Sequence, residues 1–200
     1  MIEDSVVRIK NERLKSLEEI FNNWAKINSR YIKSAGGDDC AYYFSERMNC
    51  SMINAACYKT KNFVSLVEVP VERKKIRGKN NSGAGRYDLY IFDGEKDYLV
   101  EAKQAWDFDK IEKMFDQSKK QIKSIKKDYR SDICIAMVFV VIGFTDVDED
   151  VLVSHISEID KIESCGTVHY YPKETRNLHG GGRYESNIYP GISIVMRHID

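Results

Sequence analysis

The stretch that decides the fold runs from Gly85 to Gln104 and has the sequence GRYDLYIFDGEKDYLVEAKQ. Aromatic and branched residues dominate positions 87–92 and return at positions 98–103, as is typical of short β-strands. Between them, residues 93–96 contain the Asp-Gly pair that favours a tight turn. The pattern therefore predicts an antiparallel hairpin.

The register of this hairpin depends on which two residues form its loop. If residues 94–95 form the loop, Asp88 lies directly opposite Glu101; if residues 93–94 form it, Asp88 lies diagonal to Glu101. Directly paired residues share one face of a sheet, and so do residues two apart on one strand. In either register we expect Asp88, Glu101 and Lys103 to project from the same side of the hairpin.

Two carboxylates and a lysine on one sheet face require a physical reason. Like charges that face each other across strands are destabilising, and a buried carboxylate without a partner costs still more. A divalent metal ion between Asp88 and Glu101 removes this cost, and Mg²⁺ favours one or two carboxylates together with water and phosphate oxygens. Lys103 can then hold an attacking water or neutralise charge on the phosphate. The three side chains therefore indicate a metal site that acts on a phosphate group.

The spacing of these residues resembles a known signature. Asp88, a spacer of twelve residues and then Glu101-Ala102-Lys103 are similar to the motif of the PD-(D/E)XK nuclease superfamily. The chain departs from that motif at Tyr87, which stands where the family has a proline that is commonly replaced. The motif is short, and its expected placement on two adjacent strands is what makes it informative.

The resemblance covers residues 40–145 and carries several expectations. It implies an α/β, restriction-endonuclease-like fold with an αβββαβ core, in which helices flank a central mixed sheet. It implies that Asp88, Glu101 and the backbone carbonyl of Ala102 bind Mg²⁺, with Mn²⁺ able to substitute. It also implies that Lys103 is catalytic and either orients the attacking water or offsets the developing negative charge.

A third acidic group has two candidates. Glu46 lies on a helix expected over residues 38–60, and a helix before the first strand often brings a glutamate to the metal in the family that the motif resembles. The alternative for Glu46 is an ion pair at the rim of the domain with Arg47 or another surface cation. Glu68, inside a strand expected over residues 63–72, is the rival third acid, and the sequence leaves the choice open.

Basic and polar residues near the hairpin are the candidates for contact with nucleic acid: Arg73, Lys74, Lys75, Arg77, Lys79, Gln104, Lys120 and Lys123. The first five precede the hairpin in a basic loop, where each cation can neutralise one phosphate. The last two belong to a lysine-rich amphipathic helix expected over residues 108–129. A solvated surface without a partner is the alternative for both segments.

The whole chain suits a single domain of residues 1–200. We expect an N-terminal helical extension within residues 1–37 (helix 4–33), a catalytic core over 38–145 and a C-terminal part over 146–200. The remaining elements predicted by hydrophobic patterning are a strand at 133–144, a helix at 146–163 and strands at 167–171 and 191–197.

Composition excludes some classes of protein. The 31 basic and 31 acidic residues balance, so any face that binds nucleic acid must be local. The start of the chain lacks the apolar segment of a signal peptide, and the apolar run at 133–144 is too short to cross a bilayer. The five cysteines are odd in number and without CxxC spacing, which is typical of reduced thiols in a cytoplasmic protein.

The sequence thus predicts a Mg²⁺-dependent endo- or exonuclease, with DNA favoured over RNA as substrate. Two alternatives remain. The chain could be a catalytically silent module that keeps the nuclease scaffold and binds nucleic acid or a protein, or an α/β protein in which Glu101 and Lys103 form only a surface ion pair. The sequence leaves the oligomeric state open, with a homodimer among the options, and predicts no membrane contact.

Overall fold

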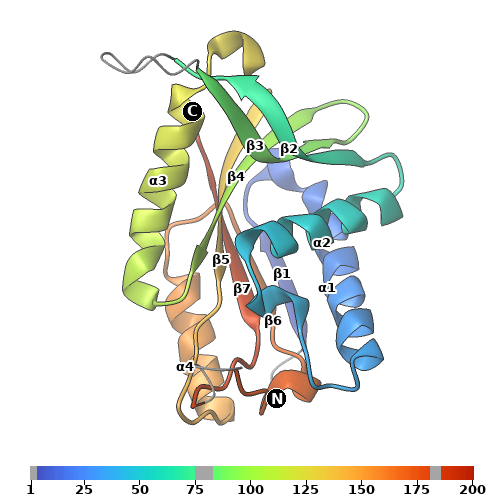
Figure 1. Ribbon diagram of the computed structural model, residues 1–200, viewed down its shortest axis with the longest axis vertical. Helices are drawn as coiled ribbons and strands as arrows, with labels where there is room; N and C mark the ends of the chain where they lie inside the picture. Colours follow the sequence, from blue (N-terminus) through green and yellow to red (C-terminus); the bar gives the residue numbers. More distant parts are fainter. Residues whose placement is uncertain (1–3, 75–82, 181–185) are drawn as a thin grey trace.

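A computed structural model of the chain describes residues 4–74, 83–180 and 186–200. Within these ranges the protein is an α/β fold in which four α-helices flank one seven-stranded mixed sheet (Figure 1). The strands are β1 (Ser5–Ile9), β2 (Val64–Glu72), β3 (Ala84–Phe92), β4 (Asp97–Ala105), β5 (Ile133–Val140), β6 (Gly166–Tyr170) and β7 (Ile192–His198). The helices are α1 (Leu17–Ser34), α2 (Glu46–Lys59), α3 (Ile111–Ser124) and α4 (Glu149–Asp160).

The sheet has the strand order β1-β6-β7-β5-β4-β3-β2. In the part of the chain that the structure describes, β4 and β5 are the one parallel pair, and the other neighbouring strands are antiparallel. A parallel pair needs a long crossover, and α3 supplies it between β4 and β5. Every residue of β5 is buried, as expected for a strand covered on both faces.

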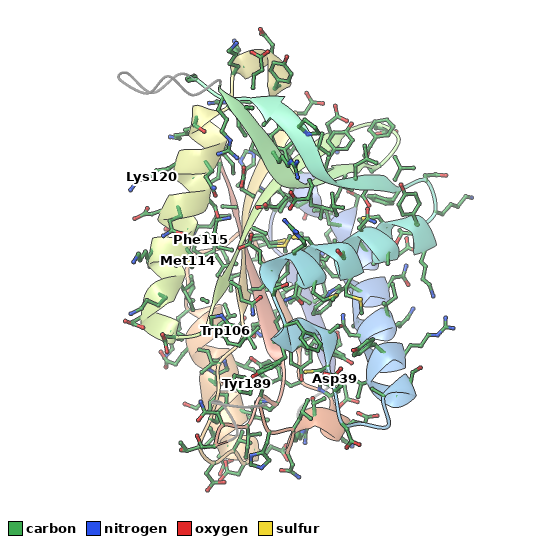
Figure 2. The ribbon with its side chains drawn as sticks, in the orientation of Figure 1. Asp39, Trp106, Met114, Phe115, Lys120 and Tyr189 are labelled. Atoms are coloured by element: carbon green, nitrogen blue, oxygen red, sulfur yellow. The ribbon has the colours of Figure 1, made fainter. Side chains whose placement is uncertain are left out.

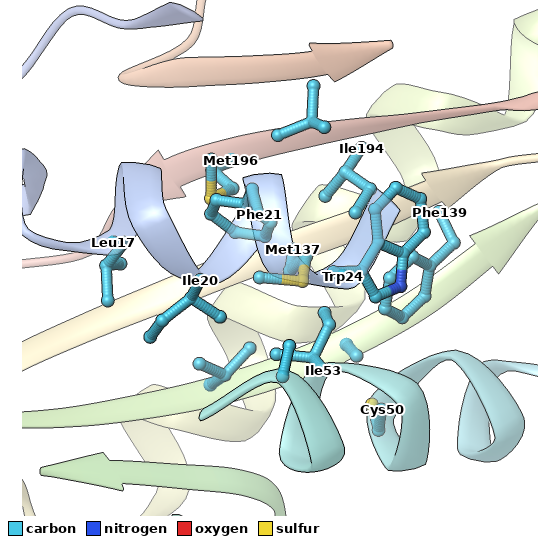
Figure 3. Packing of buried hydrophobic residues seen from close by; sticks show 14 of the residues in the cluster. Leu17, Ile20, Phe21, Trp24, Cys50, Ile53, Met137, Phe139, Ile194 and Met196 are labelled. Carbon is cyan, nitrogen blue, oxygen red and sulfur yellow. The ribbon is translucent and has the colours of Figure 1, made fainter. Parts of the chain in front are cut away.

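Two hydrophobic cores lie on opposite faces of this sheet. On one face α1 and α2 pack against β4, β5 and β7, and Figure 3 shows Trp24 and Ile53 from these helices beside Met137 and Ile194 from the strands. On the other face α3 and α4 cover the sheet through apolar residues such as Phe115. The sheet is therefore the middle layer of three.

The start of the chain differs from its prediction. The expected helix over residues 4–33 is wrong at its beginning, because Ser5–Ile9 form β1 at the edge of the sheet and the helix begins at Leu17. The SVVRI segment is rich in β-branched residues, and its partner β6 lies about 160 positions further along the chain. A partner so remote in sequence leaves no local periodic signal.

Other predicted elements are confirmed with shorter bounds. The helix expected over residues 38–60 begins at Glu46, because the Ser45 hydroxyl accepts a hydrogen bond from the Met48 amide and caps it. The helix expected over 108–129 is α3 (111–124), with a short 3₁₀ turn before it at 108–110 and another after it at 127–129.

The hairpin has the first of its two predicted registers. Leu89 pairs with Val100 and Phe92 with Asp97, so residues 94–95 form the loop. Gly94 has a φ of 96°, a conformation that glycine adopts without steric cost. This register brings Asp88 to the level of Glu101.

Among the described residues, every helix is too short or too polar to cross a bilayer.

Candidate active site

The site forms where β3 separates from β4. Going back along β3 from the hairpin loop, Leu89 is the final residue that pairs with β4. Pairing of β3 with β2 continues beyond it to Ala84. At the point of separation the Asp88 carboxylate accepts a hydrogen bond of 2.7 Å from the Ala102 amide. The side chain of Asp88 thus takes the place of a strand partner, and a cleft opens beside it.

Five elements or their caps meet at this cleft of about 460 Å³. They are the start of α2, strands β2, β3 and β4, and helix α3. The lining residues are Ser45, Glu46, Arg47, Cys50, Val67, Glu68, Asp88, Lys103 and Gln121. Most of these side chains are charged or polar, which distinguishes the cleft from the two apolar cores.

Lys103 links the acidic groups of the cleft. Its ammonium nitrogen lies 3.6 Å from Asp88 Oδ2 and 3.5 Å from Glu46 Oε1, and it also donates to the Ala102 carbonyl. The side chain is only 16% exposed, so these interactions are poorly screened by solvent. The structure therefore brings together the predicted lysine, Asp88 and Glu46.

Glu101 is the most deeply buried carboxylate of the group, at 1% exposure. Burial raises its pKa to about 8, and the negative charge of Asp88 adds to that rise. The Arg73 guanidinium, 2.9 Å from Glu101 Oε1, and the Lys103 ammonium offset only part of the effect. The Asp88 carboxylate is therefore close enough to disfavour ionisation of Glu101.

Both candidates for the third acidic group line the cleft. Burial raises the pKa of Glu46, and Lys103 offsets part of that rise. Glu46 contacts Lys103, which is largely buried, whereas the alternative from the sequence paired Glu46 with Arg47 or another surface cation. Arg47 instead contacts Glu68, which also contacts Arg86.

The residues expected to contact nucleic acid are dispersed. Arg73 is held against Glu101, and Lys74 is exposed. Lys120 and Lys123 are exposed on α3 and do not line the cleft, and Lys120 points away from α2 (Figure 2). Gln104 accepts a hydrogen bond from Asn49 at 3.4 Å.

Three further predicted contacts, Lys75, Arg77 and Lys79, lie outside the described residues.

Sequence reasoning missed Gln121 on α3, which lines the cleft. It also missed the pairing of Glu68 with Arg47, which lines the cleft, and with Arg86, which does not. Gln121 follows Ser118 by three positions and precedes the buried Ile122, so it lies at the margin of the buried stripe. A polar residue at that margin is the sequence feature that could have indicated Gln121. Arg47 and Arg86 carried none, since they are 39 positions apart in the chain.

The donor atoms suit a hard cation. Carboxylates from Asp88, Glu101 and Glu46 and the carbonyl of Ala102 are oxygen ligands of the kind that Mg²⁺ prefers. Burial raises the pKa of Glu101 most, and a bound cation would offset both that effect and the added effect of the Asp88 charge. Within residues 4–74, 83–180 and 186–200, no three His, Cys, Asp or Glu side chains are arranged closely enough to form a ready metal site.

A second polar cluster resembles a hydrolase triad but cannot act as one. His169 Nδ1 lies 2.9 Å from Ser193 Oγ, and Nε2 lies 3.0 Å from Asp160 Oδ1. Ser193 is fully buried, and its hydroxyl also lies 2.9 Å from that of Tyr171. A substrate has no access to this serine, so the cluster stabilises β6 and β7.

Comparison of the chain with protein-family models, with curated proteins and with solved structures found no match.

Proposed function

We propose that the protein is a metal-dependent nuclease with a restriction-endonuclease-like core. The element order α2-β2-β3-β4-α3-β5, with β4 parallel to β5, supports the αβββαβ core expected from the motif. The observation that carries the proposal is the position of Lys103, whose amine lies within 3.6 Å of both Asp88 and Glu46 where β3 leaves β4.

Asp88, Glu101, Glu46 and the Ala102 carbonyl are the groups that would hold Mg²⁺ in this proposal. When bound, Mg²⁺ lowers the pKa of a coordinated water and offsets the charge that develops on the phosphate. The Ala102 amide orients Asp88, since it donates to that carboxylate at 2.7 Å. Lys103, poorly exposed and fixed between Asp88 and Glu46, positions the water and balances negative charge.

The proposed reaction is hydrolysis of a phosphodiester bond, with DNA as the favoured substrate. The test is incubation of the purified protein with labelled duplex DNA, single-stranded DNA and RNA in Mg²⁺, Mn²⁺ or EDTA. We expect cleavage with either metal and none in EDTA. Lys103→Ala should lower the rate by about 10³-fold or more, because it removes a group that acts on the developing charge.

Lys126→Ala is the matched control for this substitution. Lys126 pairs with the exposed Glu72 outside the cleft, so its loss changes the net charge equally without touching the site. Circular dichroism and thermal unfolding should be the same for the two variants and the wild type. A Lys103→Ala protein that cuts at the wild-type rate would refute the proposed mechanism.

A catalytically silent nucleic-acid-binding module is the second candidate. The observation in its favour is that the charges of the site are already compensated by protein groups, with Arg73 against Glu101 and Lys103 between Asp88 and Glu46. Calorimetric titration with Mn²⁺ separates the two candidates. If the wild type binds Mn²⁺ and Asp88→Asn does not, the nuclease is supported. If the wild type binds DNA but no Mn²⁺, the silent module is supported.

A further inference from the structure

Two arginines share one carboxylate at the rim of the cleft. Arg47 Nη2 lies 3.3 Å from Glu68 Oε1, and Arg86 Nη1 lies 3.2 Å from Glu68 Oε2. The arginine side chains are 75% and 66% exposed, and that of Glu68 is 32% exposed. The bridge therefore joins α2 to β3 through β2, and its Arg47 and Glu68 line the cleft that contains Asp88 and Lys103.

Glu68 has a backbone conformation that is unusual for its residue type. Its φ is 56°, in the left-handed region, although it lies inside a β-strand. The ladder between β2 and β3 skips this position, because Val67 pairs with Leu89 and the next pair is Val69 with Tyr87. The local backbone is thus strained where the side chain meets both arginines.

Stability does not account for this arrangement. Exposed ion pairs are each worth about 0.2–1 kcal/mol, whereas a non-glycine residue in a sparsely populated backbone region costs about 1–3 kcal/mol. Strain that persists without a matching gain in stability is characteristic of sites that act on a ligand. The bridge is therefore best explained by what it does when a ligand arrives.

The geometry of the bridge matches a phosphodiester group. Each oxygen of the Glu68 carboxylate faces a different arginine, as the two non-bridging oxygens of one phosphodiester can do. Guanidinium groups are suited to this recognition because their planar donor array fits oxyanions. A carboxylate and a phosphodiester are also both oxyanions with a single formal charge.

We propose that Arg47 and Arg86 form a clamp for a backbone phosphate of the nucleic acid, and that Glu68 occupies the clamp until the substrate displaces it. This inference deepens the proposed nuclease function and rests on it for the identity of the polymer. Arg47 directly follows Glu46, whose carboxylate contacts Lys103, so the clamp adjoins the proposed catalytic group. A polymer can fill both positions at once, whereas a small anion fills only one.

The test measures binding without cleavage. Fluorescence anisotropy of labelled duplex and single-stranded DNA is followed in EDTA, at salt concentrations from about 50 to 200 mM. Arg47→Gln and Arg86→Gln should each weaken binding about tenfold, since each loses a charge-assisted contact. Each should also reduce the salt slope on duplex DNA by about 0.9, because one fewer phosphate is neutralised.

Glu68→Gln should have the opposite effect. It keeps the shape of the side chain but removes the competing charge, so affinity should rise about two- to tenfold. Glu72→Gln is the matched control, because Glu72 lies on the same strand, pairs with Lys126 outside the cleft and changes the net charge equally. Arg30→Gln on α1 controls for the loss of one positive charge.

The outcomes separate the clamp from the nuclease. If Glu68→Gln and Glu72→Gln raise affinity equally, or if Arg47→Gln binds like Arg30→Gln, the clamp is refuted whatever the cleavage assay shows. If the clamp variants behave as expected while the wild type cuts nothing in Mg²⁺ or Mn²⁺, the clamp stands and the nuclease proposal fails. Circular dichroism first checks that each variant is folded, and its binding is measured afterwards.

Discussion

At the scale of single residues, Glu101 has the most costly position of the carboxylates near the cleft. A carboxylate that is 1% exposed and close to Asp88 is difficult to ionise, and its pKa of about 8 expresses that difficulty. The position is unfavourable for stability and is explained by the proposed metal site. The cost should therefore appear in the pH dependence of unfolding.

Glu101→Gln should stabilise the protein at pH 8. The pKa is higher in the folded state (about 8) than in the unfolded chain (about 4.5), so the native state binds more protons between these values and wild-type stability falls as pH rises. Glutamine does not titrate and still accepts a hydrogen bond from Arg73. We expect a gain of about 1–3 kcal/mol at pH 8 that shrinks toward zero at pH 4.

Urea unfolding of both proteins across this pH range measures the effect. Glu95→Gln, at the exposed hairpin loop, controls for loss of a carboxylate. A Glu101→Gln protein that is no more stable than the wild type at pH 8 would contradict the raised pKa.

At the scale of elements, β2 combines a regular strand with one strained position. The strand pairs with β3 along most of its length, yet Glu68 interrupts the ladder with a positive φ. Glycine adopts that conformation without steric conflict, whereas elsewhere in a strand glycine costs about 0.5–1 kcal/mol in conformational entropy. A change to glycine should therefore raise stability at position 68 and lower it at a position of β2 with regular backbone.

Replacing the side chain at position 68 by glycine should therefore reveal the strain. Relative to Glu68→Gln, Glu68→Gly should be more stable by about 1 kcal/mol, because both lack the charge and only glycine relieves the backbone. At Glu72, whose φ is negative, glycine should instead be less stable than glutamine. The denaturant midpoints of the four variants measure these differences. If the glycine variant is less stable than the glutamine variant at both positions, strain at Glu68 is ruled out.

At the scale of the whole molecule, buried histidines should set the acid limit of stability. His155 on α4 lies between Phe144 and Tyr171, at ring distances of 5.2 and 6.2 Å, and burial lowers its pKa to about 4. Burial also lowers the pKa of His169, although Asp160 offsets part of that effect. Both must gain a proton when the chain unfolds in mild acid.

The expected consequence is a loss of stability as pH falls from about 6.5 toward 4. In that window the unfolded chain binds more protons at position 155 than the native state does, so the free energy of unfolding rises with pH. His155→Phe should reduce this acid-induced loss of unfolding free energy by on the order of 2 kcal/mol. Thermal unfolding between pH 4 and 7 measures it, with His198→Phe at the partly buried end of β7 as control; equal slopes in the wild type and His155→Phe would exclude the effect.

Local patterns determined much of the architecture. Alternation of apolar residues and the Asp93-Gly94 turn predicted the hairpin, and helical spacing predicted α1, α2, α3 and α4. The same alternation placed Asp88, Glu101 and Lys103 together, because side-chain direction in a hairpin follows from register alone.

Long-range contacts decided the rest. Pairing of β1 with β6, the positive φ of Glu68, and the meeting of Arg47 with Arg86 depend on segments distant in the chain, whose contacts leave no periodic trace in sequence. The burial that raises the pKa of Glu101 likewise arises only when α3 and β5 cover β4. The sequence by itself therefore predicted that Asp88, Glu101 and Lys103 share one face. The tertiary structure decided how far Glu101 is buried and which basic side chains surround it, because desolvation exists only in the packed molecule.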